Sequence, residues 1–100
     1  MEFEWDERKN RENIRKHGLD FADAPLVFDG PLLAWLDTRG DYGEDRWTGI
    51  GMAMGRVVVV SFTPRKPERL RIISFRKATK KERRLFEREV ARKLWHIQEN

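Results

Sequence analysis

The segment RLRIISFRKATKKE, Arg69 to Glu82, carries arginines and a serine inside a run that alternates like a β-strand. Arg71 and Arg76 are of the residue type that binds phosphate bidentately, and Ser74 could add a neutral hydrogen bond. The residue types of the segment are therefore compatible with binding of a phosphate. Strict alternation predicts two mixed faces, with Leu70, Ile72, Ser74 and Arg76 on one and Arg71, Ile73, Phe75 and Lys77 on the other.

Two interpretations of these arginines are open. A sheet that a helix covers on one side can present a polar groove on the other, where guanidinium groups would meet a polyanion. Alternatively, Arg71 and Arg76 are strand-end residues paired with acids such as Asp37 or Glu68, and such pairs contribute little.

The segment that follows predicts an amphipathic helix with a cationic flank. Thr79 and Glu82 match a capping box, and one narrow apolar arc holds Phe86, Val90, Leu94 and Ile97. We expect this arc to pack on the sheet. The other flank carries Lys81, Arg84, Arg88, Arg92 and Trp95. Such a flank can bind a nucleic-acid backbone, with the indole for stacking, or it can be an ordinary solvated face.

An expected first helix, DERKNRENIRKHG, raises the question of proton transfer. By i, i+3 and i, i+4 spacing, one of its faces gathers Lys9, Asn13, Lys16 and His17. Histidine is the usual proton carrier near neutral pH. However, His17 precedes the expected C-cap Gly18, where the helix dipole stabilises an imidazolium without any function. We expect no role for His96.

Other chemistries find little support. The chain has no cysteine and only two distant histidines, so no spacing suggests a metal site. The stretch GIGMAMG, Gly49 to Gly55, does not match a dinucleotide-binding loop and follows no βα unit. We therefore expect no cofactor and no metal.

Composition predicts one domain, residues 1–100, of an intracellular, soluble protein in the cytoplasm. There is no apolar run long enough to span a bilayer and no secretory leader pattern. The net charge of +4 is unevenly divided, because residues 1–55 carry 7 Lys and Arg against 12 Asp and Glu, whereas residues 56–100 carry 14 against 5. This asymmetry favours a basic surface for a polyanion or an acidic partner, unless the fold intermixes the halves.

The expected fold class is α+β. A small antiparallel sheet has three or four main strands, at about residues 32–36, 46–54, 56–63 and 70–77, to which EFEW could add a short N-terminal strand. RVVVVSFT is expected at the centre of the sheet, because four successive valines suit a strand covered on both faces. Two N-terminal helices, the second near residues 21–28 and weakened by Pro25, and one C-terminal helix flank the sheet.

Several segments together resemble the BrnT family, the toxin half of BrnT/BrnA toxin-antitoxin systems. They are WDERKNRENIRKHGLDF, APLVFDGPL, RWTGIGM, VVVVSFTPR and, most specifically, RLRIISFRKATKKER. The resemblance covers Phe3 to Phe86. It implies a RelE-like fold, metal-independent endoribonuclease activity, and inhibition of translation and growth. It also implies a ribbon-helix-helix BrnA-like antitoxin that forms a heterotetramer with the toxin and links it to operator DNA.

The same resemblance implies roles for particular residues. Catalysis at the scissile phosphate would fall to Arg71, Ser74 and Arg76, with Arg46 as a further phosphate ligand and His17 or Lys16 for proton transfer. The RNA backbone would be held by Arg65 and Lys77. The cationic faces of the two expected helices, read from their spacing and not from the resemblance, add Lys9, Lys16, Arg84 and Arg88 as candidates for binding the same backbone. The chain departs from the family at Phe62, where relatives commonly carry Tyr or His. If that residue does acid-base work in relatives, this chain has lost it.

Three hypotheses therefore follow. The first is a ribonuclease toxin. The second is a catalytically weak member that serves as an antitoxin-binding or nucleic-acid-binding module. The third, a DNA-binding repressor, is disfavoured because no helix-turn-helix pattern is present.

Overall fold

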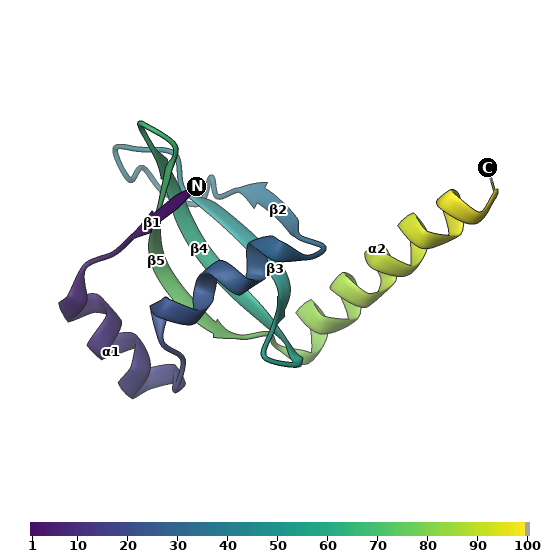
Figure 1. Cartoon of the computed structure of the whole chain (residues 1–100), viewed down its shortest axis with the longest axis horizontal. Coiled ribbons are helices and arrows are strands. Elements are labelled where there is room, and N and C mark those ends of the chain that lie inside the picture. Colours follow the sequence, from purple (N-terminus) through teal and green to yellow (C-terminus); the bar gives the residue numbers. More distant parts are fainter. Residues whose placement is uncertain (100) are drawn as a thin grey trace.

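The computed structural model describes the backbone of residues 1–99 and the side chains of residues 1–93. A five-stranded sheet in the order β1-β5-β4-β3-β2 forms the centre of the molecule (Figure 1). The elements are β1 (Glu2–Glu4), α1 (Glu7–His17), the 3-10 helix η1 (Phe21–Asp29), β2 (Leu33–Leu36), β3 (Trp47–Ala53), β4 (Arg56–Arg65), β5 (Arg69–Lys77) and α2 (Lys80–Glu99). The expected α+β class is confirmed, and within the described residues no helix is both long and apolar enough to cross a membrane.

The sheet is mixed rather than antiparallel, which corrects the prediction. The residues EFE do form a strand, but β1 pairs parallel to β5, with Phe3 opposite Leu70. The other neighbouring strands are antiparallel, because each pair is joined by a direct reversal of the chain. β4 is the middle strand, as its valines predicted, and Val58, Val59 and Val60 are buried.

A bulge in β5 changes which residues share a face. Ser61 of β4 pairs with Ser74, but the next residue, Phe62, pairs with Ile72, so Ile73 is left without a partner. One extra residue on a strand reverses its alternation beyond that point. Strict alternation along β5 was therefore a wrong prediction.

Each face of the sheet has its own cover. On the η1 face, the buried core joins η1 and Leu19 to residues of β3, β4 and β5, including Val60, Phe62 and Phe75. Close approach of η1 requires glycine in β3, since a Cβ at Gly51 would lie 2.7 Å from Val27 Cγ1. Gly49 and Gly51 of GIGMAMG thus serve packing, whereas Gly55 takes a positive φ of 76° in the turn between β3 and β4. The α2 face is covered only in part, by Phe86 packed against Ile50 and Val59.

Helix α1 closes the edge of β5 beyond β1. Asp6 caps its first turn by accepting from the Lys9 N–H at 3.1 Å, and Gly18 ends it with φ 70°, as predicted. The amide of buried Asn13 donates to the Phe75 carbonyl oxygen at 2.7 Å and accepts from the Phe75 N–H at 3.1 Å. A side chain thus takes the place of a neighbouring strand.

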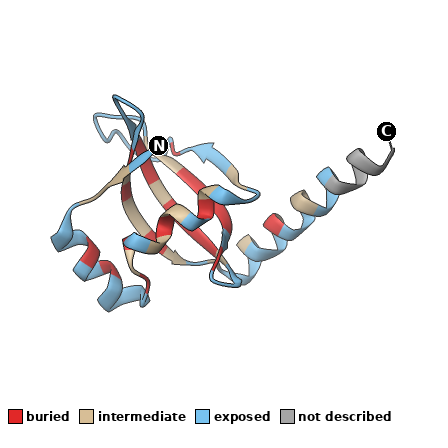
Figure 2. Ribbon diagram, in the orientation of Figure 1, coloured by how far each residue is buried: buried red, intermediate tan, exposed pale blue. Residues whose placement is uncertain are grey.

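Helix α2 begins at the predicted capping box. The Thr79 N–H donates to Glu82 Oε1 at 2.8 Å, and the Glu82 N–H donates to Thr79 Oγ1 at 3.2 Å. Phe86, Leu85 and Val90 pack on the sheet, and the axis of the helix runs away from the body of the protein (Figure 1). Among residues 80–93, Phe86 alone is buried (Figure 2). The side chains predicted for the rest of the apolar arc and for stacking, Leu94, Trp95 and Ile97, lie outside the described residues, as does His96.

Candidate phosphate-binding face

The α2 face of the sheet carries a row of hydroxyl groups. Thr48, Ser61 and Ser74 are successive cross-strand partners on β3, β4 and β5, and Trp35 of β2 is opposite Thr48. Cross-strand partners share a face of a sheet. The next positions toward α2 are Ile50, Val59 and Arg76, so this row borders the apolar patch that α2 covers.

On the side of the hydroxyl row that is farther from α2 lies the arginine row, which contains Arg46, Thr63 and Arg71. Thr63 is opposite Arg71, which donates to Glu4 of β1 at 3.2 Å. Arg46 does not belong to β3 as predicted but immediately precedes it, so that it continues the ladder beside Thr63. Among the described residues, Arg46 Nε and Thr63 Oγ1 are the buried side-chain polar atoms without a hydrogen-bond partner. Most buried polar side-chain atoms in proteins have a hydrogen-bond partner, so these two atoms mark a place where a polar group of a ligand or an ordered water could bind.

The bulge brings the predicted residues together. Arg71, Ser74 and Arg76 are opposite Thr63, Ser61 and Val59, which alternate on one face of β4. Strict alternation would have put Arg71 on the face opposite to the other two. The structure therefore gathers the three residues, together with Arg46, on the α2 face.

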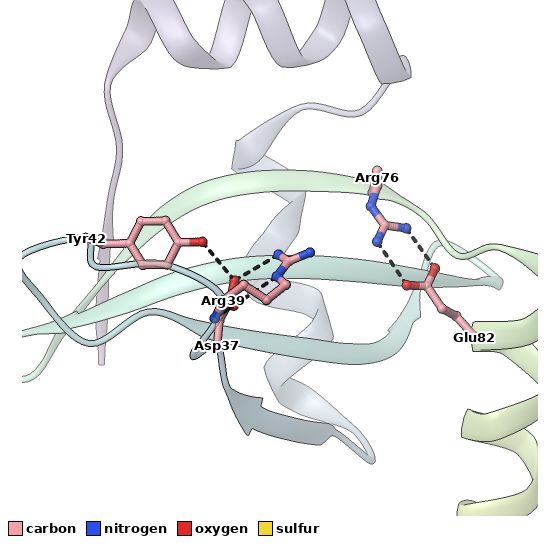
Figure 3. Close-up of polar contacts among 5 residues, drawn as sticks. All are labelled: Asp37, Arg39, Tyr42, Arg76 and Glu82. Carbon is pink, nitrogen blue, oxygen red and sulfur yellow. Dashed lines mark hydrogen bonds and ion pairs between the residues drawn. The ribbon is translucent and has the colours of Figure 1, made fainter.

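Arg76 is held by an acid of α2. Its two terminal nitrogens donate to the two carboxylate oxygens of Glu82 at 2.8 and 2.9 Å (Figure 3). These hydrogen bonds lower the pKa of Glu82 to about 2, with further lowering by the Thr79 N–H, while burial acts in the opposite direction. The same bonds raise the pKa of Arg76. The pairing interpretation was right for this arginine, although its partner is neither Asp37 nor Glu68.

The loop between β2 and β3 presents a further cation that the sequence analysis missed. The carboxylate of buried Asp37 accepts from Arg39 Nε and a terminal nitrogen at 3.0 and 2.9 Å, and these bonds chiefly lower the pKa of Asp37 to about 2. Tyr42 donates to the same carboxylate at 3.4 Å, and its ring lies 3.9 Å from the Arg46 guanidinium carbon. Arg39 itself is 83% exposed and close enough to Arg76 to oppose the rise in its pKa (Figure 3).

Acidic residues of the first half of the chain pair with arginines of the second half. We call the part of the α2 face that carries Arg46, Arg71 and Arg76 the arginine face. Arg69 and Arg65 are cross-strand partners at its far end, where they form ion pairs with Glu2 and Glu44. Together with Glu4 on Arg71, these pairs show that the two halves do intermix. The basic surface is therefore less charged than the division of the sequence indicated.

Other predicted residues lie elsewhere. Lys9, Lys16 and His17 are exposed on α1, beside the edge of β5, and their side chains make no hydrogen bond or ion pair within residues 1–93. Asn13, predicted to share their site, is buried as a structural clamp. Lys77 is opposite Val58 and so lies on the η1 face.

Phe62 belongs to the core rather than to the arginine face. It is 7% exposed and packs edge-on against Phe28, with ring centroids 5.1 Å apart. A side chain at this position points into the η1 face, so a Tyr or His here would add no group to the α2 face. Within residues 1–93, no three His, Asp or Glu side chains are grouped to hold a metal ion.

Helix α2 lines the remaining side of this face. Arg84 and Arg88, predicted to bind RNA, border a groove whose other side is Trp35. Alternation within LAWL could have placed Trp35 beside the site, whereas no local pattern marks Arg39 or the bulge.

The fold and the face together define a class: a small α+β protein whose partly open sheet presents arginines and hydroxyls suited to a phosphate-bearing polyanion. The profile of the family described as the ribonuclease toxin BrnT of type II toxin-antitoxin systems matches residues 5–82. The crystal structure of the Brucella abortus ribonuclease toxin BrnT is 36% identical with a TM-score of 0.61, and the match covers 80% of this chain and 99% of that one. No curated protein matches the chain.

The chain therefore belongs to the BrnT family of ribonuclease toxins. The family match ends at Glu82, so most of α2 lies outside it.

Proposed function

We propose that this protein is the toxin of a type II toxin-antitoxin pair and an endoribonuclease whose α2 face binds and cleaves RNA. The observation that carries the proposal is the register of β4 and β5, which aligns Arg71, Ser74 and Arg76 on one face. The orphaned Nε of Arg46 and hydroxyl of Thr63 lie in the same arginine row. An incoming phosphate would supply the acceptor that Arg46 lacks and a partner for the Thr63 hydroxyl.

The arginines would stabilise the negative charge that develops on the phosphate in the transition state. The ribose 2′-oxygen would attack the adjacent phosphorus as its proton leaves, and the bond from phosphorus to the 5′-oxygen of the next nucleotide would break, giving a 2′,3′-cyclic phosphate and a 5′-hydroxyl that takes up a proton. The negative charge that builds on the phosphate oxygens in this step is stabilised by hydrogen bonds from guanidinium groups. Arg71 would reach the phosphate by exchanging its single contact with Glu4, because both side chains are partly exposed. Cleavage by this route needs no metal ion.

Arg76 would bind a phosphate while it remains paired with Glu82. A guanidinium has five N–H donors, of which two are used on Glu82 and one on the Lys77 carbonyl oxygen at 3.2 Å. The remaining donors are free to bind a phosphate while Glu82 fixes the orientation of the group. Ser74, one ladder position away from Arg76, would add a neutral hydrogen bond.

The partner in this proposal is a BrnA-like ribbon-helix-helix antitoxin in the cytoplasm. An antitoxin that covers the arginine face would compete with RNA, and the resulting heterotetramer would reach operator DNA only through the antitoxin. Acidic side chains already occupy these arginines in the free protein, since Glu2, Glu4 and Glu44 pair with Arg69, Arg71 and Arg65. Carboxylates of an antitoxin could take the places of these glutamates and form the same ion pairs with the arginines.

A second candidate function is a binding module with weak cleavage. The observation that favours it is the position of His17, exposed on α1 at the edge of β5 rather than on the face that holds Arg71 and Arg76. Without a group that titrates near neutral pH beside the phosphate, charge stabilisation alone would remain. Proton transfer by His17 or Lys16 stays a prediction.

Induced expression tests the proposal. We expect growth arrest and cleavage of cellular RNA with the unchanged protein and with Arg15→Ala, whose exposed side chain on α1 pairs only with Glu12 among the described residues. Arg71→Ala should abolish both effects, and cleavage by purified protein should persist in EDTA. Arrest that persists in Arg71→Ala would remove the catalytic assignment, whereas RNA binding without cleavage by the unchanged protein would favour the binding module.

A further inference from the structure

A groove of about 400 Å³ separates β2 from the first half of α2. Its apolar lining comes from Trp35, Ile50 and Leu85, and its cationic lining from Lys81, Arg84 and Arg88. The volume lies within the range of pockets that bind small organic groups, about 300–1,000 Å³. An apolar slot bordered by cations suits an aromatic group that carries negative charge beside it.

Trp35 supplies the aromatic surface of the groove. It is 41% exposed, although tryptophan is highly buried on average, and its register with Thr48 places it on the α2 face. Nucleobases stack on exposed aromatic side chains irrespective of base identity, because every base has a π-face. The indole is thus a platform that the fold leaves accessible.

The cations of α2 are spaced to follow a backbone. Lys81, Arg84 and Arg88 are exposed, and they recur at helical intervals on one flank of α2. No acid within residues 1–93 forms an ion pair with them, in contrast to Arg71 and Arg76. Like charges four residues apart repel, so a bound polyanion would stabilise this flank.

The groove adjoins the arginine face. Glu82 lines the groove and at the same time holds Arg76 by two hydrogen bonds. Ile50, in the floor of the groove, is opposite Val59, which in turn is opposite Arg76. A strand of RNA with a phosphate at Arg76 would therefore have its adjacent nucleotide at the entrance of the groove.

We propose that the groove is a nucleobase subsite for single-stranded RNA. A base next to the phosphate at Arg76 stacks on Trp35, and Arg84 and Arg88 bind the phosphate that follows. The strand must be single because a stacked base in this slot cannot remain paired in a duplex. The inference rests on the proposed ribonuclease function and deepens it, and it assigns a role to a part of α2 that lies beyond the family match at residue 82.

Fluorescence anisotropy with a labelled, fully 2′-O-methylated RNA decamer tests the subsite, because that oligomer binds but has no attacking hydroxyl. Trp35→Ala should weaken binding about tenfold, within the range measured for loss of one base-aromatic stack, and Trp35→Phe should retain most of the affinity. Leu36→Ala is the matched control, since Leu36 is the adjacent residue of β2, is 42% exposed and points to the other face. With an abasic oligomer of the same length, Trp35→Ala should bind as well as the unchanged protein.

The outcomes separate the subsite from the proposed function. Equal binding of the decamer by Trp35→Ala and the unchanged protein, with binding lost in Arg71→Ala, overturns the subsite and leaves the ribonuclease proposal standing. A Trp35→Ala loss that persists with the abasic oligomer also overturns base stacking. Absence of RNA binding by the unchanged protein overturns both proposals.

Discussion

The ion pair between Arg76 and Glu82 predicts a specific dependence of stability on pH. Glutamine in place of Glu82 can still cap α2, because a capping box accepts Gln at this position. Glu82→Gln therefore removes the charge from the contact with Arg76 while keeping its shape. In the unchanged protein, the two terminal nitrogens of Arg76 donate to the carboxylate oxygens of Glu82 at 2.8 and 2.9 Å. In the variant, these donors face a neutral amide.

The size of the effect follows from the pKa of Glu82. It falls from an ordinary 4.5 to about 2, and at about 1.36 kcal/mol per pKa unit this sets a ceiling of about 3.4 kcal/mol. Arg76 and Glu82 are 35% and 24% exposed, so solvent screening reduces the expected loss to about 1–2 kcal/mol. Since the folded-state pKa is depressed, this stability is fully present above pH 4.5 and is lost as the pH falls toward 2.

Urea unfolding at pH 7, 4 and 2.5 measures the prediction. The free energy of unfolding of Glu82→Gln should lie about 1–2 kcal/mol below that of the unchanged protein at pH 7, and the gap should narrow at pH 2.5. Glu87→Gln is the matched control, on the same helix with an exposed side chain. A gap no larger than that of the control at pH 7, or one that stays constant down to pH 2.5, would refute the reasoning.

Two further substitutions test other parts of the structure. Asn13→Ala removes both hydrogen bonds to the backbone of Phe75 and leaves those groups buried, so it should lower the unfolding free energy by about 2–4 kcal/mol in a thermal or urea melt. Activity per folded molecule should not change, and a selective loss of activity would instead place Asn13 in a functional site with Lys9, Lys16 and His17, as the helical spacing predicted. Arg39→Ala should reduce the slope of log affinity for RNA against log salt by about one phosphate contact. It should also lower the melting temperature, because the buried carboxylate of Asp37 loses its guanidinium partner. An unaltered slope would remove Arg39 from the binding face.

Local signals allowed much of the fold to be predicted. The caps at Asp6, Gly18 and Thr79 depend on residues within a few positions of one another, and each was confirmed. The central place of β4 followed from four successive valines, which need cover on both faces. These features depend on short-range chemistry that a single sequence contains.

The features that were missed depend on contacts between distant segments. The parallel pairing of β1 with β5 joins residues 67 positions apart in the chain, and it supplies Glu4 as the acid for Arg71. The bulge at Ile73 arises from the register with β4, and without it Arg71 would point away from Ser74 and Arg76. Candidate residue types were therefore predictable from the segment RLRIISFRKATKKE, whereas their gathering on one face was not.

Single-turnover cleavage of a short RNA by purified protein tests the central claim most directly. We expect Arg71→Ala to lower the rate constant by a factor of about 100 or more, as the loss of a donor to developing charge does in other enzymes. Arg71→Lys should restore little, because lysine cannot bind a phosphate bidentately, and Arg15→Ala should cleave at the unchanged rate. Equal rates for Arg71→Ala and Arg15→Ala would show that the α2 face of the sheet is not the site of RNA cleavage.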